Sequence, residues 1–330
     1  MINVAINGFG RIGRAAFEIA LENKNLNVVA VNDLGDLNNL AYLLKFDSAR
    51  GRYSETVTVK KDKLVIGKKE FLFLAEKEPE KLPWKKLKVD VVLECTGVFT
   101  KKDDAKKHLS AGAKTVIISA PSDSEDILTV VRGVNDLNAK GESIIANASC
   151  TTNCTAPVMA VLEASFGVSK ALLSTVHALT ASQRAVDLAD KKDWRRGRAA
   201  SINIIPSTTG AATATAKVLP GLKNKFDGIS FRVPVVCGSA IDIVALLKKN
   251  VTVEELNDAF RAAAKTKLLK GILEASEDEL VSSDIIGTTA SAIVDLQYTR
   301  VVGGNLVKIV AWYDNEWAYS NRLVEMCERV

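Results

Sequence analysis

One cysteine of this chain stands where a thiol is favourably ionised. Cys150 follows the apolar run Ser143–Ala146 and precedes Thr151–Phe166, whose composition predicts a helix. Amides at a helix N-terminus, together with the helix dipole, lower the pKa of a thiol and make the thiolate available as a nucleophile. The other four cysteines occur where a cysteine usually packs as a small hydrophobe, and the odd total of five argues against a disulfide framework. The sequence therefore predicts one reactive thiol, at Cys150.

The chain has two histidines, and one of them can serve this thiol. His177 comes directly after the apolar run Ala171–Val176, so a predicted strand ends at its imidazole. An imidazole beside a thiol can take up the thiol proton, which makes His177 the natural general base for Cys150. His108 lies beside two lysines near the end of a predicted helix, where we expect a cation. With two histidines and no Cys-x-x-Cys spacing, we expect no metal site.

A glycine-rich turn near the N-terminus predicts a second kind of site. Gly8, Gly10 and Gly13 follow the apolar run Ile2–Ile6 and open a segment with helical spacing of its apolar residues. The first glycine permits a tight turn, the second lets the backbone approach a pyrophosphate, and the third allows close helix packing. Asp33 stands 20 positions after Gly13, where a carboxylate can accept hydrogen bonds from an adenosine ribose. That carboxylate repels a phosphate at the same place, so the sequence favours NAD over NADP.

The elements that must position these residues change character halfway along the chain. In the first half, short apolar runs alternate with amphipathic stretches, which predicts parallel strands joined by helices. These are the strands Ile2–Ile6, Val28–Val31, Val89–Leu93, Thr115–Ser119 and Ser143–Ala146 and the helices Arg11–Leu21 and Lys101–Ala111. The second half has longer apolar strands that allow an antiparallel or mixed sheet. These are Ala171–Val176, Ile229–Val236, Ala240–Leu247, Ile293–Gln297 and Leu306–Trp312, with helices Thr151–Phe166, Thr209–Leu219, one that begins after Thr252, and Glu316–Arg329.

We therefore expect an α/β chain of two domains. Residues 1–149 are predicted to form a doubly wound, Rossmann-type dinucleotide domain around a parallel sheet. Residues 150–314 are predicted to form an α+β catalytic domain with a mostly antiparallel sheet. The length of 330 residues, with 47% apolar and 25% charged residues, is typical of a globular chain of this size.

Charge and hydropathy narrow the possible partners. The formal net charge of +5, with a basic stretch from Lys191 to Arg198, suits small anionic substrates. No arginine-rich tail and no aromatic-and-glycine RNA-binding stretch accompanies it, which argues against a nucleic-acid partner. No apolar run approaches the roughly 18 residues that a membrane helix needs. The N-terminus leads directly into the strand Ile2–Ile6 without an export signal, so we expect the cytoplasm.

Four stretches resemble the signature segments of phosphorylating glyceraldehyde-3-phosphate dehydrogenases, in the order of that family. They are Ala146–Asn153, Thr175–Thr180, Asn203–Ala212 and Trp312–Trp317, and the likeness runs from residue 2 to nearly the C-terminus. The resemblance implies an oxidoreductase of glycolysis and gluconeogenesis, which oxidises D-glyceraldehyde 3-phosphate to 1,3-bisphosphoglycerate with NAD and inorganic phosphate. It implies that Cys150 forms a hemithioacetal and then a thioester, and that His177 is the general base.

The resemblance also implies how two anions are held. Thr180 and Arg232 are expected to bind the substrate phosphate. The inorganic phosphate is expected to lie among Ser149, Thr151, Arg196, Thr209 and Gly210.

For the cofactor, the resemblance adds residues to the glycine turn. These are Arg11 and Ile12 at the pyrophosphate, Lys77 and Ser119 near the adenosine, and Asn315 at the nicotinamide amide. Ala189 departs from the family, because NAD-specific members have proline there, and this departure leaves NADP use open. The resemblance further implies a homotetramer, and a C-terminal helix, about residues 315–330, that packs back on the first domain.

Two alternatives remain open from the sequence. Erythrose-4-phosphate dehydrogenase is a related enzyme that shares the thiol, the base and the first domain. A catalytically silent dinucleotide- or nucleic-acid-binding protein could share the fold, although such a protein has no physical need for Cys150, His177 and Arg232 together.

Overall fold

The computed structural model describes residues 1–191 and 193–330, so Lys192 of the basic stretch lies outside the described residues. The chain divides into two compact units. The first comprises Met1–Val130, Asn135–Ser149 and Ser320–Val330, and the second comprises Val131–Val134 and Cys150–Tyr319. These units differ from the expected bounds at two places, because residues 131–134 and 315–319 belong to the second unit.

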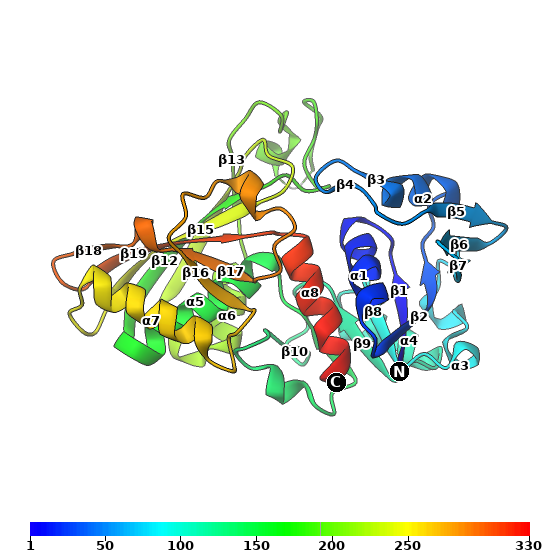
Figure 1. Cartoon of the computed structure of the whole chain (residues 1–330), viewed down its shortest axis with the longest axis horizontal. Helices are drawn as coiled ribbons and strands as arrows, with labels where there is room; N and C mark the ends of the chain where they lie inside the picture. Colours follow the sequence, from blue (N-terminus) through cyan, green and yellow to red (C-terminus); the bar gives the residue numbers. More distant parts are fainter. Residues whose placement is uncertain (192) are drawn as a thin grey trace. The chain divides into compact units, whose positions relative to one another are not determined.

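The first unit is built on a twisted sheet of strand order β10-β11-β9-β8-β1-β2-β7-β6-β5 (Figure 1). Neighbouring strands from β10 to β7 pair in parallel, and β6 and β5 extend the sheet by antiparallel pairs. The strands are β1 (Ile2–Asn7), β2 (Leu26–Asn32), β5 (Val57–Lys60), β6 (Lys63–Ile66), β7 (Lys69–Leu74), β8 (Val91–Glu94), β9 (Thr115–Ile118), β10 (Leu128–Thr129) and β11 (Ile144–Ala146), with the separate pair β3 (Phe46–Asp47) and β4 (Gly51–Arg52). Strand β8 is buried along its whole length, which is usual for a parallel strand covered on both faces.

Helices connect the strands of this sheet and cover it. They are α1 (Arg11–Glu22), α2 (Leu37–Lys45), α3 (Trp84–Leu87) and α4 (Lys102–Ser110). The last helix, α8 (Trp317–Glu325), begins in the second unit, but its residues Leu323 and Val324 lie in one buried cluster with Ile6 and Phe17 of the first. The C-terminal residues from Ser320 onward therefore help to form the core of the first unit.

The second unit is built on a mixed sheet of strand order β13-β14-β12-β15-β19-β17-β16, with β18 paired to β19. Most pairs are antiparallel, and β12 with β14 and β16 with β17 are the parallel pairs among the described residues. The strands are β12 (Val168–His177), β13 (Ile205–Thr208), β14 (Phe226–Arg232), β15 (Ser239–Leu247), β16 (Leu273–Ser276), β17 (Ala292–Asp295), β18 (Arg300–Val302) and β19 (Leu306–Tyr313). Together the two sheets confirm the predicted architecture of a Rossmann-type domain and a mostly antiparallel catalytic domain.

Three helices pack on one face of this second sheet. They are α5 (Cys150–Phe166), α6 (Ala211–Val218) and α7 (Val253–Lys265). Inward residues of β12, β15 and β19 alternate with outward ones and share a buried cluster with residues of these helices. Helix α7 begins directly after Thr252, as expected, with a capping box in which Thr252 and Glu255 bond to each other's backbone N–H. No helix in residues 1–191 or 193–330 combines the length and the apolar character needed to cross a bilayer.

One predicted strand is displaced. The run Ile229–Val236 was expected to be a strand to its end, but β14 begins at Phe226 and ends at Arg232. Pro234 has no N–H to donate, so a central strand between β12 and β13 cannot continue through it. The early end places Arg232 at the last ladder position of the strand.

Candidate active site

The turn after β1 needs its three glycines for three different reasons. Gly8 has a φ of +95°, and a Cβ there would lie 2.6 Å from the backbone nitrogen of Thr96. A Cβ on Gly13 would lie 1.9 Å from the carbonyl oxygen of Gly8, so α1 can approach the turn only with glycine at this position. Gly10 has open space around its Cβ position, and no side chain caps the helix there. Open space at the start of α1 is what a pyrophosphate requires, so the residues fit a dinucleotide.

Asp33 is tied to the same turn. Its Oδ2 accepts a hydrogen bond from the backbone N–H of Phe9 at 2.6 Å, and its Oδ1 accepts one from Gly35 at 2.8 Å. The carboxylate is thereby held beside the start of α1. The guanidinium of Arg11 instead pairs with Asp47, at 3.0 Å and 3.2 Å, so only the backbone amide of Arg11 fits its expected role at the pyrophosphate.

The remaining expected cofactor residues of the first unit lie near the same edge of the sheet. Ile12 is in the first turn of α1, Lys77 is exposed in the loop after β7, and Ser119 directly follows β9. Because β1, β2, β7 and β9 run parallel, their carboxyl ends share one edge, where open α/β sheets bind nucleotides.

Asn315 belongs to the second unit and is buried. Its Oδ1 accepts hydrogen bonds from Ser239 Oγ at 2.9 Å and from the backbone N–H of Gly238 at 3.1 Å. These bonds fix which end of the amide is the acceptor, so its NH2 group is the donor that a nicotinamide carboxamide oxygen would require.

Cys150, His177 and Arg232 meet at the ends of three elements. Cys150 is the first residue of α5, and its Sγ lies 3.4 Å from Nε2 of His177. His177 ends β12 and Arg232 ends β14, and these strands pair in parallel with the two residues opposite each other. The two side chains are therefore at the same end of the sheet, and Nη1 of Arg232 lies 2.7 Å from Nδ1 of His177.

Burial is the largest influence on the pKa values of Cys150 and His177. Burial raises the pKa of the Cys150 thiol, although the positive charge of Arg232 and hydrogen bonds with Thr151 oppose that rise. Burial, and then the charge of Arg232, lower the pKa of His177 to about 4. The expectation of a lowered thiol pKa at Cys150 is therefore wrong for the resting site. His177 is the neighbouring group that can take the thiol proton when the thiolate forms.

The tautomer of His177 determines whether it can do this. Its Nδ1 lies 2.7 Å from the carbonyl oxygen of Ala178, which only accepts, so that contact requires the proton on Nδ1. In this tautomer the lone pair of Nε2 faces the sulfur of Cys150. Arg232 only donates, so its contact with Nδ1 belongs to the other tautomer. The two contacts require opposite tautomers, and only the form with the proton on Nδ1 presents a lone pair on Nε2 to Cys150.

The expected anion-binding residues lie on a loop, in a short 3-10 helix and at helix starts. Thr180 is exposed on the loop that follows His177, and its hydroxyl contacts Gln183 and Ser182. Arg196 lies in a short 3-10 helix, Trp194–Gly197, at 3.4 Å from Asp193, and its charge helps to lower the pKa of Arg232, after burial. Two guanidinium groups are therefore close enough to influence each other, which suits a site for anions.

Four more of these residues lie at helix starts. Ser149 is the residue before α5 and belongs to the first unit, and Thr151 is in the first turn of α5. Thr209 accepts a hydrogen bond from Ala211 at 3.2 Å, and Gly210 is the N-cap of α6 with open space around its Cβ position. The first residues of α6 share a buried cluster with α5.

Two residues of the site were not predicted from the sequence. The Tyr313 hydroxyl lies 2.9 Å from Thr151 Oγ1, and its ring lies edge-on to the imidazole of His177 at 6.0 Å. Ser239 accepts a hydrogen bond from the backbone N–H of Ala178 at 3.0 Å and donates to Asn315. Tyr313 lies in the segment Trp312–Trp317, which resembles a family signature and could have pointed to it. No sequence pattern pointed to Ser239.

The expectation that His108 is a cation near a helix end is wrong. His108 is fully buried, and the indole N–H of Trp84 donates to its Nδ1 at 3.0 Å. An indole N–H only donates, so Nδ1 carries a lone pair and the ring is neutral.

The five cysteines are free, and they differ in access to a base. Burial raises the pKa of Cys95, Cys154, Cys237 and Cys327, and the last three are buried. Cys150 is half-buried and can pass its proton to His177.

We expect iodoacetamide at pH 7 to label Cys150 at least about tenfold faster than any other cysteine. Peptide mass spectrometry over a time course measures the five rates, and equal labelling of two cysteines would contradict this assignment.

Comparison with known proteins identifies relatives over the whole chain. Residues 2–102 match the family described as glyceraldehyde 3-phosphate dehydrogenase, NAD binding domain, and residues 149–315 match its C-terminal domain. Glyceraldehyde-3-phosphate dehydrogenase of Geobacillus stearothermophilus is 53% identical over 327 residues, covering 98% of this chain and 97% of the relative. The enzyme of Streptomyces coelicolor is 53% identical over 328 residues, with the same coverage. Glyceraldehyde-3-phosphate dehydrogenase 1 of Kluyveromyces lactis is 49% identical over 331 residues, covering 100% of both chains.

Proposed function

The chain belongs to the glyceraldehyde-3-phosphate dehydrogenase family, and we propose that it oxidises D-glyceraldehyde 3-phosphate to 1,3-bisphosphoglycerate with NAD and inorganic phosphate. The observation that carries this proposal is the contact of Cys150 Sγ with His177 Nε2 at 3.4 Å, with Arg232 beside the same imidazole. A thiol, a base and a cation in contact suit the oxidation of an aldehyde that bears a phosphate.

The first step forms a carbon–sulfur bond. His177 takes the proton of Cys150, the thiolate attacks the aldehyde carbon, and the carbonyl oxygen receives that proton to give a hemithioacetal. His177 then removes the hydroxyl proton as the carbon loses a hydride. Bound NAD supplies the acceptor for that hydride, and Gly8, Gly10, Gly13, Asp33 and Asn315 are proposed to hold it. The substrate is left as a thioester on Cys150.

The second step breaks the carbon–sulfur bond. An oxygen of inorganic phosphate attacks the thioester carbon, the Cys150 thiolate leaves, and the acyl phosphate is released. Thr180 and Arg232 are proposed to hold the phosphate of the substrate. The proposed site of the attacking phosphate comprises Ser149, Thr151, Arg196, Thr209 and Gly210, supported by the open helix start at Gly210 and the guanidinium of Arg196.

Neither alternative function is favoured by an observation. The relatives at about half identity are named glyceraldehyde-3-phosphate dehydrogenases, not erythrose-4-phosphate dehydrogenases. A silent binding protein would not need a thiol and an imidazole nitrogen 3.4 Å apart.

The assay that tests the proposal follows absorbance of reduced nicotinamide. We expect reduction of NAD with glyceraldehyde 3-phosphate only when phosphate or arsenate is present, and at least about tenfold lower kcat/KM with erythrose 4-phosphate or with NADP. Equal turnover without phosphate or arsenate would contradict the assignment of an acyl phosphate as the product. A higher kcat/KM with erythrose 4-phosphate would show that erythrose 4-phosphate, and not glyceraldehyde 3-phosphate, is the substrate. Cell fractionation tests the accompanying proposal of a cytoplasmic enzyme, which activity in the membrane or secreted fraction would exclude.

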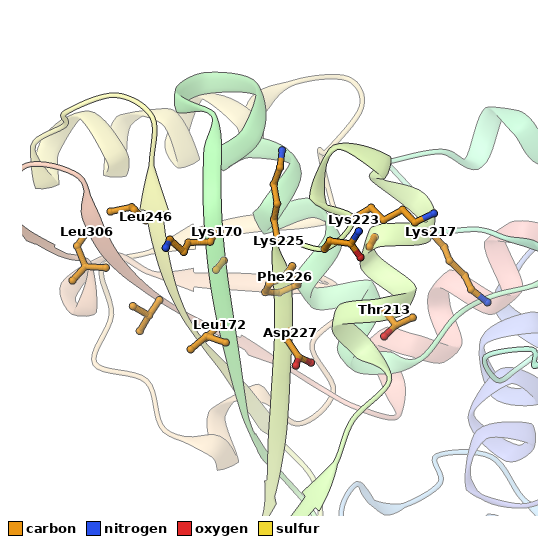
Figure 2. Close-up of a pocket in the computed structure, with 14 residues that line it drawn as sticks. Lys170, Leu172, Thr213, Lys217, Lys223, Lys225, Phe226, Asp227, Leu246 and Leu306 are labelled. Carbon is orange, nitrogen blue, oxygen red and sulfur yellow. The ribbon is translucent and has the colours of Figure 1, made fainter.

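The outer face of the second sheet supports assembly of several copies. Helices α5, α6 and α7 pack on the inner face of this sheet. The outer face exposes four large apolar side chains: Leu172, Ile229, Val244 and Leu306. Of these, Leu172 and Val244 are directly opposite each other on paired strands. Figure 2 shows Leu172, Leu246 and Leu306 there, beside a groove of about 1200 Å³. Four lysines line this groove: Lys170, Lys217, Lys223 and Lys225. None of the proposed active-site residues lines it. Apolar patches of this kind mark protein interfaces.

We expect a homotetramer, with this outer face inside the assembly. Sedimentation equilibrium should give four times the chain mass of 35.5 kDa. Leu172→Arg places a charge in the interface and should dissociate the tetramer, whereas Leu137→Arg, on an exposed residue of the first unit, should not. A monomer in the unmodified protein, or a tetramer that survives Leu172→Arg, contradicts the assignment of this face.

A further inference from the structure

The first unit contains a buried carboxylate that the chemistry above does not use. Glu94 is the last residue of β8 and is 1% exposed. Its Oε1 accepts from the backbone N–H of Thr96 at 2.8 Å and from the Thr96 hydroxyl. Its Oε2 accepts from Nδ2 of Asn7 at 2.5 Å and lies 3.0 Å from Nε2 of His108. Four contacts thus converge on one side chain inside the protein.

The partners show that all four contacts are donated to Glu94. Trp84 donates to Nδ1 of His108, so the ring proton is on Nε2 and points to Glu94. The Thr96 hydroxyl oxygen accepts from the N–H of Val98 at 3.1 Å, which leaves its own proton for Glu94. A side chain that only accepts is an ionised carboxylate, and here neutral donors rather than a cation stabilise it.

This charge orients a chain of amides across the sheet. Because Glu94 accepts from the NH2 group of Asn7, the Asn7 oxygen faces Asn32 and accepts from it at 2.7 Å. The Asn32 amide in turn donates to the carbonyl of Glu76 at 2.9 Å and accepts from its N–H at 2.8 Å. One acceptor thereby fixes the direction of both asparagine amides and clamps the backbone of Glu76. The network spans the carboxyl ends of β8, β1 and β2.

Three loops of the dinucleotide edge depend on this network. Thr96 abuts the glycine turn, since its nitrogen occupies the space that a Cβ on Gly8 would need. The N–H of Gly8 donates to the carbonyl of Asn32 at 2.7 Å. Glu76 precedes Lys77 in the loop after β7. The glycine turn, the loop of Lys77 and the loop of Thr96 are therefore fixed to one buried carboxylate.

We propose that Glu94, acting through Thr96, Asn7, Asn32 and His108, is a positioning residue that pre-organises the three loops for the dinucleotide. Loops already held in their binding geometry lose less entropy when the ligand binds, so the network contributes to affinity for NAD without touching the reacting atoms. A carboxamide at position 94 has the same shape but presents an NH2 group to at least one pair of donors. Those donors lose their acceptor, and the asparagine amides lose their fixed direction.

The test measures NAD binding to the intact enzyme by calorimetry. For Glu94→Gln we expect the Kd for NAD to rise by about tenfold or more. For Thr96→Val, which removes the hydroxyl contacts with Glu94 and with the N–H of Val98, we expect a rise of about threefold. We expect the KM for NAD to rise in parallel, while kcat at saturating NAD and the KM for glyceraldehyde 3-phosphate stay within about twofold. The matched control is Glu70→Gln, which removes a carboxylate from β7 of the same unit where it pairs with Lys60 and Lys63 on the surface.

The proposal is overturned if folded Glu94→Gln binds NAD as the unmodified enzyme does. It is also overturned if Glu94→Gln lowers the unfolding temperature without changing the Kd, since a merely structural residue would do this. If Glu94→Gln does not fold, Thr96→Val decides the matter on its own, because it leaves the charge and three of its donors in place. Binding of NAD is measured without turnover, so this result is independent of whether the proposed reaction is correct.

Discussion

Cys150→Ser lowers kcat by about 10⁴-fold or more while leaving the Kd for NAD within about twofold. A serine hydroxyl is far less acidic than a thiol, so His177, whose pKa is lowered to about 4, cannot generate the alkoxide at neutral pH. An ester is also a poorer acyl donor to phosphate than a thioester. The glycine turn and Asp33, which are proposed to bind the cofactor, lie in the other unit and are unchanged. Steady-state kinetics and calorimetry on the same preparation measure both quantities.

The control for this substitution is Cys154→Ala. Cys154 lies one turn along α5 from Cys150 and is fully buried in the core cluster. Loss of its sulfur is expected to reduce stability and to leave kcat within about threefold. If Cys150→Ser retained a tenth of the activity, or if Cys154→Ala were the inactive variant, the nucleophile would have been assigned to the wrong residue.

His177→Asn is expected to lower kcat by about a thousandfold, because it removes the base that receives the thiol and hydroxyl protons. Asparagine keeps a polar group at the end of β12 but cannot take a proton at pH 7. The KM for NAD should be unchanged, since the imidazole contacts Cys150, Ala178 and Arg232 in the second unit. The measurement is kcat for both enzymes at saturating substrates.

The pH dependence separates a base from a structural histidine. His177 must be neutral to act, and its pKa is lowered to about 4, so the enzyme should lose activity only as the pH falls towards that value. In His177→Asn this acid limb should vanish. The residual rate should instead rise continuously with pH as the Cys150 thiol ionises, since burial raises its pKa. A variant that retains the acid limb would show that another group is the base.

The sequence predicted most of the features that depend on residues close together in the chain. Gly8, Gly10, Gly13 and Asp33 could be predicted as one site because their geometry is set by neighbours in the chain and by one strand–helix crossover. Cys150 and His177 could each be placed at the end of an element. The hairpin of β5 and β6 with strand β7 was missed, because β5 and β6 are only four residues long and charged residues stand at the strand ends, at Lys60, Lys63 and Lys69.

What the sequence could not show depends on contacts between distant residues. The pKa of Cys150 follows from burial and from Arg232, 82 positions away, and not only from the helix start on which the prediction was based. His108 was expected to be a cation because it lies beside two lysines near the end of a helix. Its neutral state follows from Trp84 and Glu94, which folding brings to it from two other segments. Pairing of β12 with β14 brings Arg232 to His177, and no local signal specifies that register.

The central claim is that Cys150 carries the substrate as a thioester that only phosphate releases. The most direct measurement is a stopped-flow reaction of the enzyme with glyceraldehyde 3-phosphate and NAD in the absence of phosphate, followed by mass spectrometry of the quenched protein. We predict a burst of about one reduced NAD per active site, an acyl group on the peptide that contains Cys150, and steady turnover once phosphate is added. Continuous reduction at the full rate without phosphate, with Cys150 unmodified throughout, would contradict the account.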